Sequence, residues 1–166
     1  MLAGRGADAA TQVLNLERLA GRLRRLGRTR TSRSHWTDYT ATCSYSDAGE
    51  QAKKVSIRSF MAEREPGTVL DVGCNTGDYS VLAAQCGARV LAIDSDEDCV
   101  ERLFQRAARE QLNILPLWVD IVNPTPALGF RNRERRSFLY RCRCECVLGL
   151  ALIHHLLVTA RIPLEE

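Results

Sequence analysis

The sequence predicts an α/β protein built on a mostly parallel, Rossmann-like sheet of about four strands with helices on both faces. From residue 68 onward, short apolar runs alternate with segments of helical periodicity. Strands that alternate with helices in this way form parallel sheets. The strands are almost continuously apolar, which is typical of a sheet that is buried on both faces.

Length and composition fit one globular domain. The chain has 166 residues, of which 45% are hydrophobic and 26% are charged. No apolar stretch approaches the roughly 18 residues that a membrane span needs. The first residues lack the apolar core of a signal peptide, and the seven cysteines are an odd number. These features predict reduced thiols and a cytoplasmic protein without membrane contact.

Positive charge is concentrated at the start of the chain. Residues 1–34 hold eight arginines against Asp8 and Glu17, whereas the remaining 132 residues hold fifteen basic and eighteen acidic side chains. We therefore divide the chain into a basic N-terminal helix and linker, 1–34, and a domain, 35–166. Nucleic-acid contact is expected only through the N-terminal segment.

Apolar residues at helical spacing predict a helix over 11–26 that stops at Gly27. Three roles are compatible with such a helix: it packs on the domain, it contacts a polyanion, or it is a mitochondrial targeting peptide.

The elements of the domain follow from its hydrophobic pattern. Residues 28–49 read as an ordered loop with aromatic residues, among them Trp36 and Tyr39. Helices are predicted over 50–64, 79–86 and 97–111. Apolar runs predict strands over 68–70, 88–93, 114–119 and 145–152, and the first three run into Asp71, Asp94 and Asp120.

Ligands of parallel sheets bind at the carboxyl ends of the strands, so these three acids mark the predicted site. The turn after the first strand contains Gly73 and Gly77, and Asn75 stands where a dinucleotide-binding turn has its second glycine. An acid at the strand end repels a pyrophosphate but attracts an ammonium or sulfonium group. S-adenosylmethionine (SAM) carries both groups, so SAM is favoured over NAD and a dehydrogenase is disfavoured.

Asp94 lies 21 residues after Gly73, a spacing at which an acid can bind ribose hydroxyls. Asp120 could accept a hydrogen bond from an adenine amino group. Each acid alone also fits a loop residue or a helix cap, but all three at successive strand ends favour a ligand site.

Two segments, VLDVGCNTGDYS and RVLAIDSDEDCV, resemble motif I and the ribose-acid segment of class I SAM-dependent methyltransferases. Three more, HWTDYTATCSYSD, LPLWVDIVNPTPALGFRNRERRSFLYR and LGLALIHHLL, resemble one bacterial branch described as nodulation-related or methyltransferase-like. The resemblance covers about residues 35–166. Asn75 departs from the generic motif, but the branch shares it. The resemblance implies the strand order 3-2-1-4, SAM as cofactor and an unidentified methyl acceptor.

The resemblance also implies roles for individual residues. Asp71 and Gly73 would hold the methionine end of the cofactor, within a turn completed by Asn75 and Gly77. Asp94 would hold the ribose and Asp120 would lie by the adenine, and a cap containing Trp36 and Tyr39 would cover the cofactor.

His154 and His155 follow the fourth strand. In this superfamily, residues at that position face the transferred methyl group. One of the pair could orient an acceptor or take its proton. We expect only one to face the pocket, because adjacent side chains point in different directions.

No metal site is predicted. Read as a strand, residues 141–146 would place Cys142, Cys144 and Cys146 on one face. Parallel side chains on a straight strand cannot enclose zinc, whose structural sites typically use C-x₂₋₄-C turns.

The function predicted is methyl transfer from SAM, and the alternative is a SAM-binding domain without catalysis. A complete domain of this superfamily has seven strands, so we expect this chain to be an incomplete, C-terminally truncated one. Its fourth strand, 145–152, would then be an exposed apolar edge, which predicts self-association and little turnover by the chain alone.

Overall fold

The computed structural model describes residues 8–27 and 47–163. The chain divides into two compact units, Met1–Arg33 and Ser34–Glu166. The first contains helix α1, Ala9–Gly27, which confirms the helix predicted over 11–26 and its end at Gly27. The predicted domain boundary at 34/35 stays a prediction, because the residues around it lie outside the described ranges.

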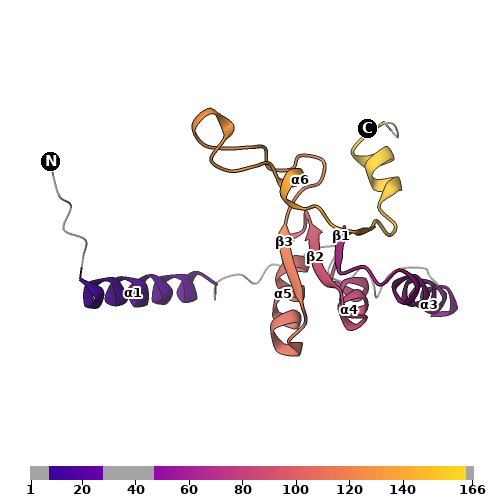
Figure 1. Cartoon of the computed structure of the whole chain (residues 1–166), viewed down its shortest axis with the longest axis horizontal. Helices are drawn as coiled ribbons and strands as arrows, with labels where there is room; N and C mark the ends of the chain where they lie inside the picture. The colour runs from indigo at the N-terminus through magenta and orange to yellow at the C-terminus, as the bar shows by residue number, and fades with distance from the viewer. Residues whose placement is uncertain (1–7, 28–46, 164–166) are drawn as a thin grey trace. The chain divides into compact units, whose positions relative to one another are not determined.

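In the described part of the second unit, four parallel strands form a sheet (Figure 1). They are β1 (Thr68–Val72), β2 (Arg89–Asp94), β3 (Ile114–Trp118) and β4 (Cys146–Leu148). Their order in the sheet is β3-β2-β1-β4. The predicted fold class and the strand order 3-2-1-4 are therefore confirmed.

Among residues 47–163, three helices cover one face of the sheet: α3 (Asp47–Arg64), α4 (Asp78–Gln85) and α5 (Glu97–Glu110) (Figure 1). Because strand residues alternate between faces, Val69 and Val90 point toward these helices while Leu70 and Ile93 point away. The second face is covered more thinly, by α6 (Phe138–Arg141), whose Phe138 is buried against the sheet.

The apolar side chains of α3 and α5 are only partly buried. In α3, Ile57 and Met61 are buried but Phe60 is 43% exposed, and in α5, Leu103 is buried but Phe104 is 56% exposed. Each helix therefore buries a narrower face than its hydrophobic pattern suggests.

The fourth strand is shorter than predicted. The apolar run over 145–152 forms only the three-residue β4, because the chain then turns and Ala151 adopts a left-handed backbone with φ 55°. A short helical segment, η3 (His155–Thr159), follows.

The segment 141–146 is not a strand, which corrects the sequence interpretation. Arg141 ends α6, Cys142 lies at the cap of that helix, and only Cys146 belongs to β4. The three cysteines therefore do not share one strand face. Across the described ranges, no group of three His, Cys, Asp or Glu side chains is arranged to hold a metal ion.

In the two described ranges, no helix combines the length and the apolar character required to cross a bilayer.

Candidate functional site

A cavity of about 550 Å³ lies beyond the carboxyl ends of β1, β2 and β3. Its size is in the range of small-molecule sites. The loops after these strands, the segment around 150–160, and Glu50 and Lys53 of α3 form its wall. The structure brings together seven of the predicted site residues in this wall: Asp71, Gly73, Asn75, Gly77, Asp94, Asp120 and His155. Trp36 and Tyr39 lie outside the described residues, so their place over the cofactor stays a prediction.

Asp71 is a buried carboxyl group in the cavity wall. It lies inside β1 rather than at its end, because the strand continues through Val72, and it is 2% exposed. Ser80 Oγ, from α4, donates a hydrogen bond to Asp71 Oδ2 at 2.5 Å. Burial raises the pKa of Asp71 to about 6, the Ser80 hydrogen bond opposes this rise, and the nearby Asp94 adds to it. The site therefore holds a carboxyl group that titrates near neutrality.

The turn between β1 and α4 is fixed to the neighbouring strand. The backbone N–H groups of Gly73 and Cys74 both donate to the carbonyl of Ile93 in β2. Asn75 adopts a left-handed backbone with φ 49°, a conformation that asparagine tolerates better than most residues. Its side-chain Oδ1 accepts the N–H of Thr76 at 2.6 Å. Asn75 thus takes the place of a glycine without preventing the turn.

Gly77 ends this turn with φ 86°, just before α4 begins. A Cβ at this position would collide with the side chain of the buried Leu103 in α5. The glycine therefore serves both the backbone conformation and the close packing of the turn on α5.

Asp94 joins two loops of the site. Its Oδ2 accepts the N–H of Asn75 at 2.7 Å, and its Oδ1 accepts the N–H of Asp96 at 2.9 Å. Burial raises its pKa, against the effect of these two bonds. Each carboxylate oxygen can accept more than one hydrogen bond, so the group is held in place and can still bind a ligand hydroxyl.

Asp120 and its neighbours form another part of the wall. The Asp120 side chain is exposed and accepts the N–H of Val122 at 2.9 Å. Ile121 and Val122 line the cavity beside it and supply apolar surface. A polar acceptor next to apolar side chains suits a flat ring with a polar edge.

The two histidines differ in position. His155 is half-buried and lines the cavity, whereas His154 is exposed and does not contribute to the wall. Their ring centroids are 3.9 Å apart. The structure thus separates the pair as expected, and their chemical roles stay predictions.

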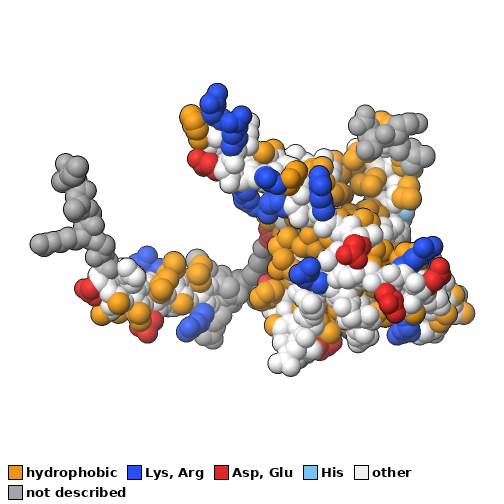
Figure 2. Space-filling view, viewed as in Figure 1, with side chains coloured by type: hydrophobic (Ala, Val, Ile, Leu, Met, Phe, Trp, Pro, Cys, Tyr) orange, Lys and Arg blue, Asp and Glu red, His pale blue; other side chains and the backbone are white. Residues whose placement is uncertain are grey.

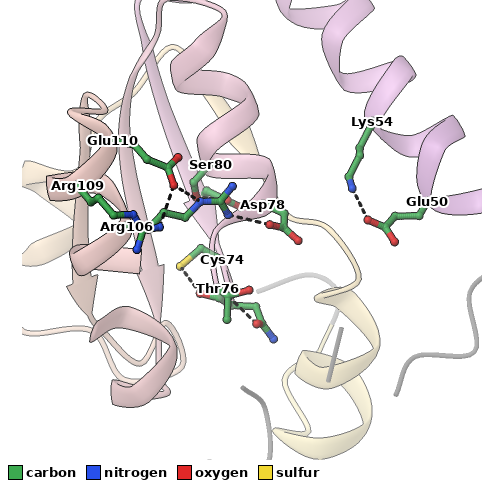
Figure 3. Close-up of polar contacts among 11 residues, drawn as sticks. Glu50, Lys54, Cys74, Thr76, Asp78, Ser80, Arg106, Arg109 and Glu110 are labelled. Carbon is green, nitrogen blue, oxygen red and sulfur yellow. Dashed lines mark hydrogen bonds and ion pairs between the residues drawn. The ribbon is translucent and has the colours of Figure 1, made fainter. Parts of the chain in front are cut away.

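Sequence reasoning missed three residues of the site: Ser80, Glu50 and Lys53. Ser80 is fully buried among the apolar residues of α4 and carries a detectable signal, a hydroxyl on an otherwise apolar helix face. Glu50 and Lys53 carry no such signal, because only the packing of α3 on α4 brings them to the cavity. Figure 3 shows Glu50 paired with Lys54 on this helix.

Comparison with known proteins identifies the domain. Residues 69–130 match the family model for a methyltransferase domain. This stretch contains the turn, Asp94 and Asp120. It belongs to a class I SAM-dependent methyltransferase domain. The cofactor of that class is S-adenosyl-L-methionine, and the acids and the glycine turn of the cavity wall fit its cationic end and its ribose.

Two curated proteins are similar to parts of this chain. The nodulation protein NoeA of Rhizobium meliloti (strain 1021) is 37% identical over 134 residues, covering 80% of this chain and 28% of that protein. This match supports the nodulation-related branch that the motifs indicated. The ribosomal protein L11 methyltransferase of Thermotoga maritima is 39% identical over 61 residues, covering 36% of this chain and 23% of that protein. The chain therefore spans about a quarter of the length of these two curated relatives.

Among solved structures, the chain is similar to magnesium protoporphyrin IX methyltransferase from Synechocystis PCC 6803, determined with bound SAH. The sequence identity is 28% and the TM-score is 0.42, over 49% of this chain and 38% of that one.

Proposed function

We propose that this chain binds SAM and transfers its methyl group to an acceptor that is still to be identified. The observation that carries the proposal is the convergence of Asp71, Asp94, Asp120 and the Gly73–Gly77 turn in one cavity. Three acids in one cavity wall suit a ligand with a positive charge, a ribose and an adenine.

Each acid would hold a different part of the cofactor. The carboxylate of Asp94 would accept hydrogen bonds from the ribose hydroxyls, since its backbone partners leave acceptor capacity. Asp120 would lie at the edge of the adenine, with Ile121 and Val122 against the ring. When bound, the cofactor supplies a methyl group activated by the charge of its sulfonium.

Asp71 and the backbone of Gly73 would bind the methionine end. The Asp71 carboxyl has a pKa of about 6, so near pH 6 it is divided between its charged and neutral forms. A cationic group in the cavity would favour the charged carboxylate. Cofactor binding would therefore be coupled to loss of a proton from Asp71 below neutral pH.

His155 would face the acceptor. From the cavity wall it could orient the acceptor or take up its proton, because a ring nitrogen of imidazole can accept a proton. The alternative is cofactor binding without turnover. Ile153 and Val158, close to this histidine in the chain, are exposed apolar side chains that do not line the cavity.

Paired histidine variants test the proposal. The full chain is supplied with methyl-labelled SAM and a bacterial extract as the source of acceptors, and transferred label is counted. His155→Ala should lower the transfer by about 100-fold or more, because it removes a general base or positioning group. Its affinity for S-adenosylhomocysteine should stay within about threefold.

His154→Ala is the matched control and should leave both quantities nearly unchanged. Equal transfer by wild type and His155→Ala would refute the role of this histidine. Binding of S-adenosylhomocysteine without any label transfer by the wild type would support the non-catalytic alternative.

A further inference from the structure

A dense group of exposed arginines follows β3. Between 131 and 143 the sequence holds six arginines and a single acid, Glu134, whereas the remainder of residues 35–166 holds nine basic and seventeen acidic side chains. All six are exposed, and within the described ranges none of them forms an ion pair with a carboxylate. We call this group the arginine patch: Arg131, Arg133, Arg135, Arg136, Arg141 and Arg143.

The fold holds the patch in a defined geometry. Leu128 and Arg135 exchange two backbone hydrogen bonds of 2.9 and 3.1 Å, which close a tight loop. The chain then enters α6, whose Phe138 is buried against the sheet. Figure 2 shows Lys and Arg side chains gathered on the loop that projects from the sheet and near α6. The patch is therefore a surface on a folded scaffold.

Aromatic rings lie among these charges. Phe130, next to Arg131 in the loop, is 76% exposed. The Tyr140 ring, 45% exposed, has the guanidinium carbons of Arg136 and Arg143 at 4.2 and 4.8 Å from its centroid. Aromatic rings and guanidinium planes both stack on nucleobases, and arginine binds phosphate oxygens in a bidentate manner.

We propose that the arginine patch binds single-stranded nucleic acid. The guanidinium groups would contact backbone phosphates while Phe130 offers its ring to an unpaired base. A membrane-binding segment would instead present a long amphipathic helix with a continuous apolar face, and α6 has only four residues. The overall charge balance of the domain conceals this surface, because acidic residues elsewhere outnumber the basic ones. The binding does not depend on the proposed methyl transfer.

The test compares two charge-matched variants of the full chain. Fluorescence anisotropy measures the binding of a labelled single-stranded oligonucleotide of about 15 nucleotides, a length that covers a typical site. One variant, R131Q/R133Q/R135Q, removes three charges from the patch. The matched control, R22Q/R24Q/R25Q, removes three exposed charges from α1. Unfolding midpoints of both are compared with the wild type.

The patch variant should bind the oligonucleotide about tenfold or more weakly than the wild type at about 0.1 M salt. The slope of log K against the logarithm of the salt concentration should become less steep by about 2, because each phosphate contact on a single strand contributes roughly 0.7 to that slope. The α1 variant should stay within about threefold of the wild type. Phe130→Ala should weaken binding about fivefold or more through lost stacking, with an unchanged salt dependence.

Three outcomes would overturn the proposal. The first is no oligonucleotide binding by the wild type, and the second is a loss confined to the α1 variant. The third is patch-dependent binding of anionic phospholipid vesicles by a chain that does not bind the oligonucleotide.

Discussion

Asp71 combines burial with an ionisable side chain, and this combination predicts how stability depends on pH. Its pKa is about 6 in the folded chain, against an ordinary value of 3.8. Between about pH 4 and 6 the folded state therefore keeps a proton that the unfolded chain has already released. The resulting contribution to stability is present below about pH 4 and is lost as the pH rises through about 6.

Asp71→Asn should remove this pH dependence, because the amide is neutral and its oxygen can still accept the Ser80 hydrogen bond. At pH 8 the variant should have a free energy of unfolding about 2–3 kcal/mol above the wild type, and near pH 4 the two should be similar.

Urea unfolding over this pH range measures the difference for Asp71→Asn. Glu101→Gln, an exposed substitution on α5, is the control and should change stability by less than about 0.5 kcal/mol. A variant less stable than the wild type at pH 8 would contradict the explanation.

At the residue scale, the sequence predicts the parts of the site that lie next to a predicted strand in the sequence. The acids and the glycine turn are recognisable because they come directly after, or at the end of, an apolar run. Lys53 is not recognisable, since it reaches the cavity only through the packing of α3 on α4.

At the scale of elements, the turn that precedes α4 needs a glycine at position 77, because a larger residue has no room there. Gly77 and Gly87 both have positive φ, at 86° and 96°. Among the described residues, a Cβ at Gly77 would meet the buried Leu103 side chain, whereas a Cβ at Gly87 would meet no atom within 4 Å. Gly87→Ala should therefore cost only the backbone strain, about 1–2 kcal/mol.

Gly77→Ala should cost about 1–3 kcal/mol more than this, because the collision adds an overpacking penalty. Chemical denaturation of both variants gives the comparison. Equal losses of stability would show that α5 yields to the extra methyl group and that the contact does not constrain the turn.

The sequence predicts the helices and strands from α3 to β3 well, because the hydrophobic periodicity and the turn residues indicate the same elements there. After β3 the prediction fails in detail. The alternating segment 141–146 suggests a strand, but Ser137 caps the short helix α6 and its oxygen accepts the N–H of Tyr140. The apolar run 145–152 suggests a long strand, but the left-handed Ala151 bends the chain.

For the whole molecule, the position of β4 at the edge of the sheet predicts self-association. Val147, the central residue of this strand, is 61% exposed. An apolar edge strand can pair with a second copy, and a lysine at the edge opposes such pairing. Sedimentation equilibrium should show a mass that rises with protein concentration for the wild type and stays closer to that of a monomer for Val147→Lys.

Val55→Lys is the control for this comparison, because Val55 is 57% exposed and belongs to α3, not to a strand of the sheet. Its sedimentation should match the wild type. A monomeric wild type at all concentrations, or an equal effect of both lysines, would refute association through β4.

Calorimetric titration of the full chain with S-adenosylhomocysteine, beside an identical titration with NAD, decides whether the cavity is a SAM site. We expect one saturable site for S-adenosylhomocysteine and none for NAD. Asp94→Asn should weaken that binding by about 1.5–3 kcal/mol, the scale of a hydrogen bond to a charged group, and Glu101→Gln should leave it unchanged. An unaltered affinity in a folded Asp94→Asn chain, or tighter binding of NAD than of S-adenosylhomocysteine, would contradict a SAM site in this cavity.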